Sequence, residues 1–370
     1  MIEQMRIVSR PNRDSKLHSM CSYMAMFPPA IPRFFIEKYS KRGDLILDPF
    51  SGRGTVPLEA CLMQRIGIGN DLNPLAFVLT MAKVDVPPKE NVLKRLQDLQ
   101  QGFMKERISI VKEDPNIKMI FSVHTLRQLI FLKKSLNWQS NHVDTFIAAM
   151  VLGVMHGGSQ GYLSLKMPNT FSMSPGYVRN YIKEHELKKP KREVFDVLLR
   201  KLNRMYEEQT VKGIALSEDA RNIKTLRNDF VDLILTSPPY TRTISYGKYN
   251  WIRLWFLGKA SKEVDKSLLN SGSIEKYIIF MTEFLSECKR LLKPKAYAII
   301  IIGDVLRRNG NTINLAEIIW NKCAKELGFT KVEEIYEDTF DGSRKVSRIW
   351  GNKRNTVMKK SDRFLIIQKN

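Results

Sequence analysis

Cysteine and histidine are scarce in this chain of 370 residues, which holds four cysteines and five histidines. The cysteines (Cys21, Cys61, Cys288 and Cys323) lie far apart without a CxxC pair, and the histidines are not clustered. A disulfide framework and a structural zinc site both require closer spacing than this. We therefore expect small core thiols, no bound metal and a reducing, cytoplasmic location.

Long apolar runs are missing as well. The longest, around Phe146–Met155 and Ala296–Ile302, fall short of the roughly 20 apolar residues that span a bilayer. The first residues also lack the apolar core of a signal peptide. The pattern predicts a protein without a membrane-spanning segment or a membrane partner.

Acidic residues are few relative to basic ones: 38 Asp and Glu oppose 60 Lys and Arg, a formal net charge of +22. Such a charge favours a polyanionic partner such as nucleic acid, although charge alone also fits a basic protein without that role. The hydrophobic content of 43% indicates a packed globular chain. Its length suffices for one large α/β domain with an insertion, or for two domains.

Short strands that end in polar residues alternate with helical patterns. The apolar run Leu45–Leu47 ends at Asp48, and after a glycine-containing turn a helical pattern begins at Thr55. A second strand, Gly67–Asn70, ends at Asp71. Glycines in such a turn let a ligand approach the backbone closely, and an acid after the second strand is where α/β folds often bind a ribose.

The same alternation returns near the middle of the chain. The predicted strands are Ile214–Leu216, Val231–Leu235 and Tyr297–Ile302, followed by an antiparallel pair, Thr330–Tyr336 and Phe364–Gln368; the predicted helices between them are Glu275–Leu292 and Ala316–Leu327. Alternation of this kind predicts an α/β fold with a doubly wound, mostly parallel sheet. Its ligands should bind at the carboxyl ends of the strands, where Asp48, Asp71, Asp219 and Ser237 lie.

Residues 89–212 have a different character, because their apolar residues recur at helical spacing. The helices expected there are Val92–Glu106, His124–Ser135, Val143–Met155 and Val194–Glu208, with an irregular stretch between Gly157 and Pro175. We predict a catalytic domain made of residues 1–88 and 213–370, interrupted by a largely helical insertion at 89–212.

Three stretches resemble motifs of one enzyme family. DPFSGRGT at Asp48–Thr55 resembles the cofactor loop of S-adenosylmethionine-dependent DNA amino-methyltransferases, and TSPPY at Thr236–Tyr240 resembles their catalytic motif. FPPAIPRFFIEKY at Phe27–Tyr39 is similar to the segment that these enzymes fold over the methionine end of the cofactor. The resemblance implies a Rossmann-like methyltransferase fold, S-adenosyl-L-methionine as cofactor, and site-specific methyl transfer to an exocyclic amino group of DNA.

The resemblance also implies roles at the cofactor site. Asp48 would lie near the methionine amino group, Asp71 would hold the ribose hydroxyls, and Asp219 would accept a hydrogen bond from the adenine amino group. For Asp71 and Asp219, an ordinary helix cap or solvated turn is the alternative. The expected cofactor-binding residues are Phe27, Pro28, Asp48, Pro49, Phe50, Gly52, Gly54, Thr55, Asp71, Leu72, Asp219 and Ala220.

The catalytic residues that the resemblance implies are Ser237, Pro238, Pro239 and Tyr240. The Ser237 side chain and the Pro238 carbonyl would accept hydrogen bonds from the amino group, and Tyr240 would stack on the extruded base. An amino group inside a duplex is out of reach, so we expect base flipping. Serine at this position of the motif favours cytosine-N4 as the target, and adenine-N6 stays open as the alternative. Carbon-5 methylation is disfavoured, because that chemistry uses a cysteine that follows a proline, and no cysteine here does.

Basic stretches supply the expected contacts to double-stranded DNA. Two residues follow the catalytic motif, five lie in the basic segment Asp341–Lys360, and four belong to KKPKR at Lys188–Arg192. These nucleic-acid-binding candidates are Arg242, Lys248, Arg344, Lys345, Arg348, Lys353, Arg354, Lys188, Lys189, Lys191 and Arg192. We interpret residues 89–212 as a candidate target-recognition region, with His156–Tyr177 near the DNA. A helical cap that only braces the sheet is the alternative.

Two further functions stay open. Related loops serve RNA amino-methyltransferases, and a non-catalytic DNA-binding subunit could keep the same fold. A bacterial restriction–modification setting is expected, with a cognate restriction endonuclease as a candidate partner. The target sequence and the oligomeric state are left open.

Overall fold

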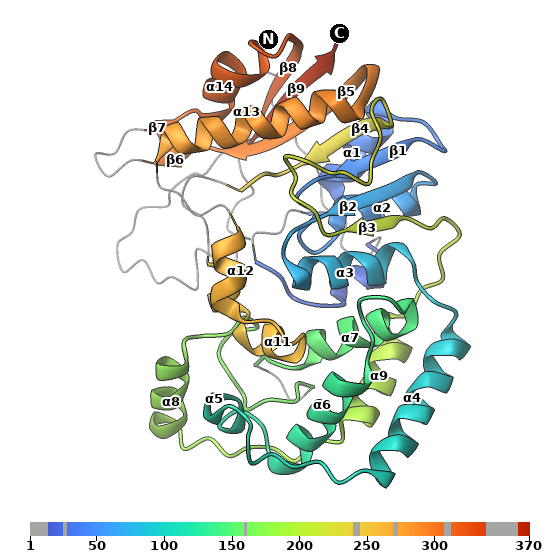
Figure 1. Cartoon of the computed structure of the whole chain (residues 1–370), viewed down its shortest axis with the longest axis vertical. Helices are drawn as coiled ribbons and strands as arrows, with labels where there is room; N and C mark the ends of the chain where they lie inside the picture. The colour runs from blue at the N-terminus through green and yellow to red at the C-terminus, as the bar shows by residue number, and fades with distance from the viewer. Residues whose placement is uncertain are drawn as a thin grey trace.

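A seven-stranded sheet forms the upper half of the molecule in Figure 1. The computed structural model describes residues 14–24, 28–158, 161–239, 245–268, 273–306, 312–337 and 362–370. The strands of the sheet are β1 (Leu45–Asp48), β2 (Ile66–Asn70), β3 (Ile214–Leu216), β4 (Val231–Thr236), β5 (Leu292–Gly303), β8 (Phe329–Glu337) and β9 (Asp362–Lys369). A small separate pair is formed by β6 (Val305–Leu306) and β7 (Thr312–Ile313).

The strand order is β3-β2-β1-β4-β5-β9-β8. The first five strands in this order run parallel, and β9 pairs antiparallel with both β5 and β8. The predicted doubly wound, mostly parallel sheet with a closing antiparallel pair is confirmed.

Helices cover both faces of this sheet. Alternate residues of β1 point to opposite faces, so Ile46 packs with α1 and α2 while Leu47 packs in the core that contains α13 and α14. Burial on both faces explains why the central strands read as continuous apolar runs. The helices around the sheet are α1 (Ala30–Tyr39), α2 (Thr55–Leu62), α3 (Pro74–Val84), α13 (Ile274–Leu291) and α14 (Leu315–Ile319), with the short 3-10 helix η2 (Lys16–Ser19) and the π-helical turn η3 (Trp320–Ala324).

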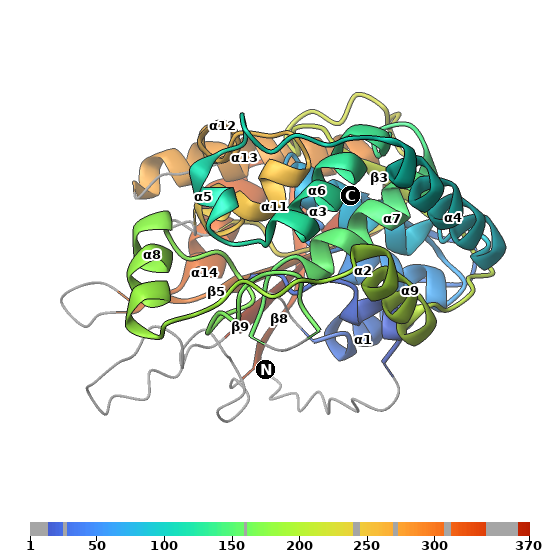
Figure 2. The ribbon, with the colours of Figure 1, turned by 90° about the horizontal axis from the view of Figure 1, so that it is seen from below.

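A second, helical layer packs against α3 and fills the lower half of Figure 1. Figure 2 shows this layer in front of the sheet, with α8 and α4 at its opposite ends. The helices between α3 and β3 are α4 (Lys89–Lys105), α5 (Pro115–Lys118), α6 (Val123–Ser135), α7 (His142–Val154), α8 (Pro175–Glu184) and α9 (Val194–Met205). The helical character predicted for residues 89–212 therefore holds for their described part.

Three helices after β4 also join the helical layer. These are α10 (Tyr246–Tyr249), α11 (Trp251–Phe256) and α12 (Ser261–Ser267). Leu254 and Val264 share a core with α4, α6, α7 and α9 rather than with the sheet. The division of the chain into a catalytic domain and an insertion stays a prediction, and the helical layer is larger than the sequence alone indicated.

Other elements also differ from the sequence predictions, among them α8 and the helix after β7. The helix α8 is absent from the sequence prediction: its apolar face is short, with Val178 buried and Tyr181 and Ile182 only partly buried against the core. The helix expected at Ala316–Leu327 changes from α14 into a π-helical turn at Trp320, although its expected stop, Gly328, does adopt a positive φ of 73°.

Candidate active site

The carboxyl ends of β1 and β4 lie side by side where the strand order changes direction, which is the usual ligand position in such sheets. The Thr236 hydroxyl donates a 2.6 Å hydrogen bond to Asp48 Oδ1, although the two residues are 188 positions apart. The same oxygen accepts a 3.1 Å hydrogen bond from Phe50 N. The structure thus brings the two distant motifs of the sequence to one edge of the sheet.

The turn after Asp48 depends on its glycines. Gly52 and Gly54 have positive φ values of 51° and 75°, a region that favours glycine. A Cβ on Gly54 would also lie 2.8 Å from Thr80 Oγ1, so the backbone approaches α3 more closely than any side chain allows. Gly54 caps α2, which begins at the buried Thr55. This turn, residues 49–54, is called the glycine loop below.

Asp71 fastens the glycine loop to the end of β2. Its Oδ2 accepts a 2.9 Å hydrogen bond from Gly52 N, and its Oδ1 accepts one of 2.9 Å from Asn73 N. The turn-forming role that the sequence left as an alternative is therefore present. Each carboxylate oxygen keeps a second lone pair, so a ribose hydroxyl could still donate to it.

Burial raises the pKa of both carboxyl groups. It raises the pKa of Asp48, which is 2% exposed, to about 7 against the opposing effect of the Thr236 and Phe50 hydrogen bonds. It likewise raises the pKa of Asp71 to about 6. Two carboxyl groups that are reluctant to ionise in the absence of a cation suit a ligand with a positively charged amino group.

Asp219 lies at the far side of this edge and is already engaged. Arg221 donates to both of its carboxylate oxygens, with a shortest distance of 2.6 Å, and holds the pKa of Asp219 below its usual range. Arg221 also lies over the Phe280 ring, 5.7 Å from its centroid, and pairs with Glu283. An adenine amino group at Asp219 would have to compete with this guanidinium.

Apolar groups line the same region. Phe50 contacts the Phe284 ring at a centroid distance of 4.9 Å, Leu72 is half-buried, and Ala220 is buried. These groups and the glycine loop, with carboxylates at two strand ends, fit the charge and shape of S-adenosylmethionine, which carries an amino group, a ribose and an adenine ring.

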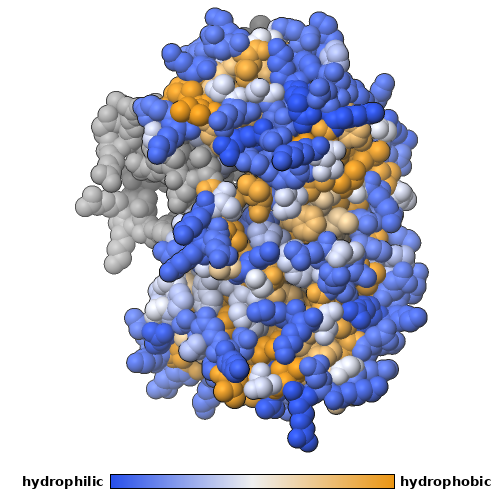
Figure 3. Space-filling view, in the orientation of Figure 1, coloured by the Kyte–Doolittle hydropathy of each residue, from blue (hydrophilic) through white to orange (hydrophobic). Residues whose placement is uncertain are grey.

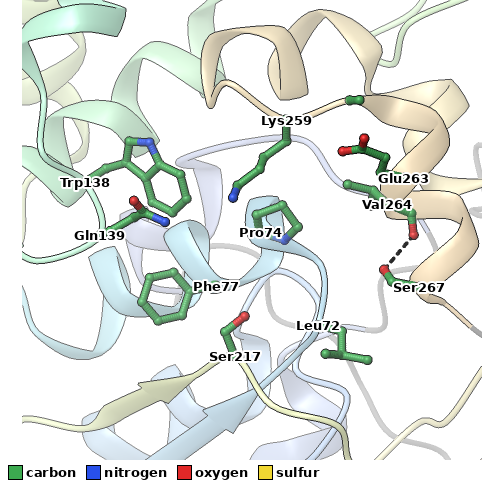
Figure 4. Close-up of a pocket in the computed structure, with 11 residues that line it drawn as sticks. Leu72, Pro74, Phe77, Trp138, Gln139, Ser217, Lys259, Glu263, Val264 and Ser267 are labelled. Atoms are coloured by element: carbon green, nitrogen blue, oxygen red, sulfur yellow. Dashed lines mark hydrogen bonds between the residues drawn. The ribbon is translucent and has the colours of Figure 1, made fainter.

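A pocket of about 390 Å³ adjoins Leu72, within the size range of small-molecule sites. Figure 4 shows the rings of Phe77 and Trp138 beside Gln139, with the Lys259 side chain extending toward them. Its remaining lining comes from Pro74, Ser217, Ala260, Glu263, Val264 and Ser267. The helical layer therefore contributes part of the wall next to the expected adenine end of the site.

The catalytic motif follows β4 directly. Ser237 and Pro239 are partly exposed, and Pro238 between them is buried. Pro28 precedes α1, where its carbonyl accepts a hydrogen bond from Ile31 N. The remaining predicted site residues, Phe27, Tyr240, Arg242, Arg344, Lys345, Arg348, Lys353 and Arg354, lie outside the described residues.

The described basic candidates lie in the helical layer. Lys188, Lys191 and Lys248 are exposed, and exposed Lys189 donates to the Lys118 carbonyl at 3.1 Å. The backbone of Arg192 is held by Thr125 Oγ1 on α6. The KKPKR run therefore rests on α5 and α6 rather than beside the glycine loop (Figure 1).

His156 also departs from its expected surroundings. It is 1% exposed, and burial lowers its pKa to about 3, with Arg253 contributing. A neutral, interior imidazole cannot contact a DNA backbone. The prediction that His156–Tyr177 lies near DNA therefore does not extend to this side chain.

Sequence reasoning missed Tyr23. Its hydroxyl accepts a 3.1 Å hydrogen bond from Asn73 Nδ2, and a Cβ on Gly52 would lie 3.4 Å from its ring. Burial and the nearby Asp71 raise the pKa of Tyr23 well above its usual value. An aromatic residue shortly before the Phe27–Tyr39 segment is the one sequence signal that could have pointed to it.

Within the described ranges, no group of His, Cys, Asp and Glu side chains is arranged to hold a metal ion. In that same part of the chain, no helix combines the length and the apolar character that crossing a membrane requires.

Comparisons with known proteins agree with the geometry of the two motifs. A family model described as DNA methylase (N6_N4_Mtase) matches residues 4–81 and 231–369, which together make up more than half of the chain. Its two matched parts contain the glycine loop and the segment that begins at β4, while the helices between them fall outside the match.

Three curated relatives are similar to parts of this chain. Type II methyltransferase M.MjaII of Methanocaldococcus jannaschii is 27% identical over 25% of this chain and 18% of its own length. Type II methyltransferase M.BsoBI of Geobacillus stearothermophilus is 21% identical over 68% of this chain and 55% of its own length. Type II methyltransferase M.MvaI of Kocuria varians is 22% identical over 79% of this chain and 78% of its own length.

The chain thus spans less than two thirds of the length of the first two relatives. The family match, in contrast, covers both motifs that meet at Asp48 and Thr236. The chain therefore belongs to the N6/N4 DNA methylase family, the S-adenosylmethionine-dependent DNA amino-methyltransferases.

Proposed function

We propose that the protein is a site-specific DNA methyltransferase that acts on an exocyclic amino group, with cytosine-N4 favoured over adenine-N6. The observation that carries this proposal is the 2.6 Å hydrogen bond between Thr236 and Asp48, which joins the glycine loop to the catalytic motif. Family membership supports methyl transfer to DNA. The serine in the catalytic motif supports the choice of cytosine.

The glycine loop, the buried carboxyl group of Asp48 and the partly buried one of Asp71 would hold the cofactor. S-adenosylmethionine supplies, when bound, an electrophilic methyl group on a sulfonium. Asp48 would ionise beside the methionine amino group and pair with it, and Asp71 would accept hydrogen bonds from the ribose. Leu72 and Phe50 would pack against the adenine ring, with Asp219 at its amino group.

Residues 237–240 would hold the target base. The lone pair of an exocyclic amino nitrogen is delocalised into the ring, which makes it a poor nucleophile. Ser237 Oγ and the Pro238 carbonyl would accept its hydrogens and draw the nitrogen toward a tetrahedral geometry. Proline lacks an N–H group and has a fixed φ, so Pro238 and Pro239 would present that carbonyl rigidly. Reaching these groups requires the base to leave the duplex.

The helical layer would recognise the target sequence. It lies against the sheet at α3, it lines the pocket beside Leu72, and it carries the exposed Lys188, Lys191 and Lys248. Lysines such as these would contact phosphates, while base contacts determine the site. A cognate restriction endonuclease is the proposed functional partner.

Methyl transfer from labelled S-adenosylmethionine tests the proposal. Wild-type protein should methylate double-stranded DNA, and mass spectrometry of the digested nucleosides should identify N4-methylcytosine. Methylation of tRNA or rRNA but not of DNA would overturn the proposed substrate. Failure of the protein to bind S-adenosylmethionine would overturn the proposal that it is an enzyme.

The variant Ser237→Ala tests the catalytic assignment. It should bind S-adenosylmethionine with unchanged affinity in calorimetry and lose methyl transfer by about two orders of magnitude, because it removes a hydrogen bond made to the reacting group. Ser140→Ala, an exposed serine on the α6–α7 connection, is the matched control and should stay fully active. A fully active Ser237→Ala variant would remove the assignment.

A further inference from the structure

We propose that Tyr23 and Tyr246 form an aromatic clasp that braces the glycine loop against the helical layer and so sets the affinity for S-adenosylmethionine. Both act as positioning residues for the cofactor, and the inference rests on the proposed function. Neither residue belongs to the motifs that the sequence identifies.

Tyr23 is the half of the clasp that contacts the glycine loop. Its ring lies against Gly52, where an added Cβ would meet it at 3.4 Å. Its hydroxyl accepts a hydrogen bond from Asn73, whose backbone N–H in turn donates to Asp71. Gly52 N donates to that same carboxylate. Tyr23 therefore contacts both residues whose backbone N–H groups donate to Asp71, Gly52 on the glycine loop and Asn73 after β2.

Tyr246 is the half that belongs to the helical layer. Its ring stacks on Tyr23 with a centroid distance of 5.8 Å and an interplanar angle of 26°, a geometry typical of stabilising aromatic pairs. Tyr246 begins α10, six residues after the end of the catalytic motif at Tyr240. The aromatic contact therefore links the cofactor loop to the chain that leaves the catalytic motif.

The helix α10 is itself held firmly. The Asp265 carboxylate accepts hydrogen bonds from Gly247 N at 2.7 Å and Lys248 N at 3.0 Å. On the other side, the Tyr249 carbonyl accepts a 2.7 Å hydrogen bond from Ser172 N. These contacts hold the backbone that directly follows Tyr246, so the stack joins two ordered parts.

Buried Arg253 continues this anchorage into the helical layer. It is 2% exposed and donates to the Leu152 carbonyl, the Asn250 side chain and the Thr170 carbonyl. The chain after the catalytic motif is therefore attached to two segments of the insertion. Through the stack of Tyr23 on Tyr246, the glycine loop is therefore supported by the helical layer, which we propose recognises the DNA sequence.

Calorimetric binding of S-adenosylmethionine to clasp variants tests the inference. Tyr246→Ala should raise the Kd between about twofold and tenfold, the range that an aromatic pair contributes, although Tyr246 lies outside the glycine loop. Tyr23→Ala should raise it at least as much, since it also loses the Asn73 hydrogen bond. The double variant should bind S-adenosylmethionine no more weakly than Tyr23→Ala does, because both changes remove the same contact.

The matched control is Tyr249→Ala on the same short helix, whose ring contacts Phe171 instead of Tyr23. It should leave the Kd unchanged. Tyr246→Phe keeps the stacking ring and should restore wild-type affinity, which a merely unfolded variant would not do. In turnover, Tyr246→Ala should raise KM for the cofactor with little change in kcat.

The outcomes separate this inference from the proposed function. Wild-type protein that does not bind S-adenosylmethionine would overturn the proposed function. If wild-type protein binds S-adenosylmethionine, three results would overturn the clasp and leave the proposed function standing. These are a Kd for Tyr246→Ala equal to that of wild type, additive effects on the Kd in the double variant, and a loss of affinity in Tyr249→Ala equal to that in Tyr246→Ala.

Discussion

Asp48 shows at the scale of one residue how a folded environment prepares an acid for a ligand. It lies at the end of β1, accepts hydrogen bonds from Thr236 and Phe50, and is almost fully removed from solvent. Desolvation disfavours its charge more than these donors favour it, and Asp71 nearby adds to the effect. The sequence identified Asp48 as a site residue, but its elevated pKa follows from burial that no local pattern reveals.

The pH dependence of cofactor binding should report on Asp48. Affinity for S-adenosylmethionine should rise as the pH increases through about 7, because the ionised carboxylate pairs with the positive amino group. Asp48→Asn should weaken binding about tenfold and remove most of this rise. Calorimetry at several pH values measures both effects, and Asp98→Asn, an exposed residue of α4, is the control. An unaltered pH profile in Asp48→Asn would contradict the assigned role.

The same shift has the opposite sign for stability. The raised pKa means that folded protein keeps a proton that the unfolded chain releases above about pH 4, its unperturbed range. The contribution of Asp48 to the free energy of unfolding is therefore full below about pH 4 and is lost as the pH rises to about 7. Urea unfolding across this window should show a shallower decline in Asp48→Asn than in wild type.

At the scale of an element, the glycine loop and α2 form a unit that the sequence describes well. The strand, the turn and the start of the helix at Thr55 all match their predicted positions, since apolar periodicity and glycine preferences are local. The helix α8 shows the limit of such reasoning, because its apolar face of Val178, Tyr181 and Ile182 spans little more than one turn. Its N-cap Ser174 is the local signal that remains.

Gly54→Ala tests how strongly backbone geometry determines this element. Alanine at a φ of 75° is strained, and its Cβ would lie 2.8 Å from Thr80 Oγ1. We expect the free energy of unfolding to fall by about 2 kcal/mol or more in urea titration. Gly176→Ala is the matched control, since a Cβ there meets nothing within 4 Å. Equal effects of the two changes would contradict this account.

At the scale of the whole molecule, the large positive net charge has to be distributed over the surface. The face shown in Figure 3 is mostly hydrophilic, with apolar residues in limited patches. The net charge of +22, which follows from the sequence, favours a polyanionic partner. Only the structure locates the described basic residues, since it places Lys188 and Lys191 at the connection between α8 and α9.

Salt dependence of DNA binding tests which lysines contact phosphate. The variant Lys188→Glu with Lys191→Glu should weaken DNA binding and reduce the slope of log K against log salt by about 0.9 per lost contact. The charge-matched control is Lys94→Glu with Lys105→Glu on α4, at the opposite end of the helical layer from α8 in Figure 2. Fluorescence anisotropy with duplex DNA measures both, and identical slopes would remove the KKPKR run from the interface.

The sequence by itself determined the sheet's strands, the glycine loop and the two motifs, because each depends on residues close together in the chain. Tertiary structure alone decided that Thr236 reaches Asp48, that Arg221 pairs with Glu283 and that Tyr246 stacks on Tyr23. It also decided that α11 and α12 join the helical layer rather than the sheet. The physical reason is that contacts between distant segments follow from how all the apolar faces pack together, and no single window of sequence contains that information.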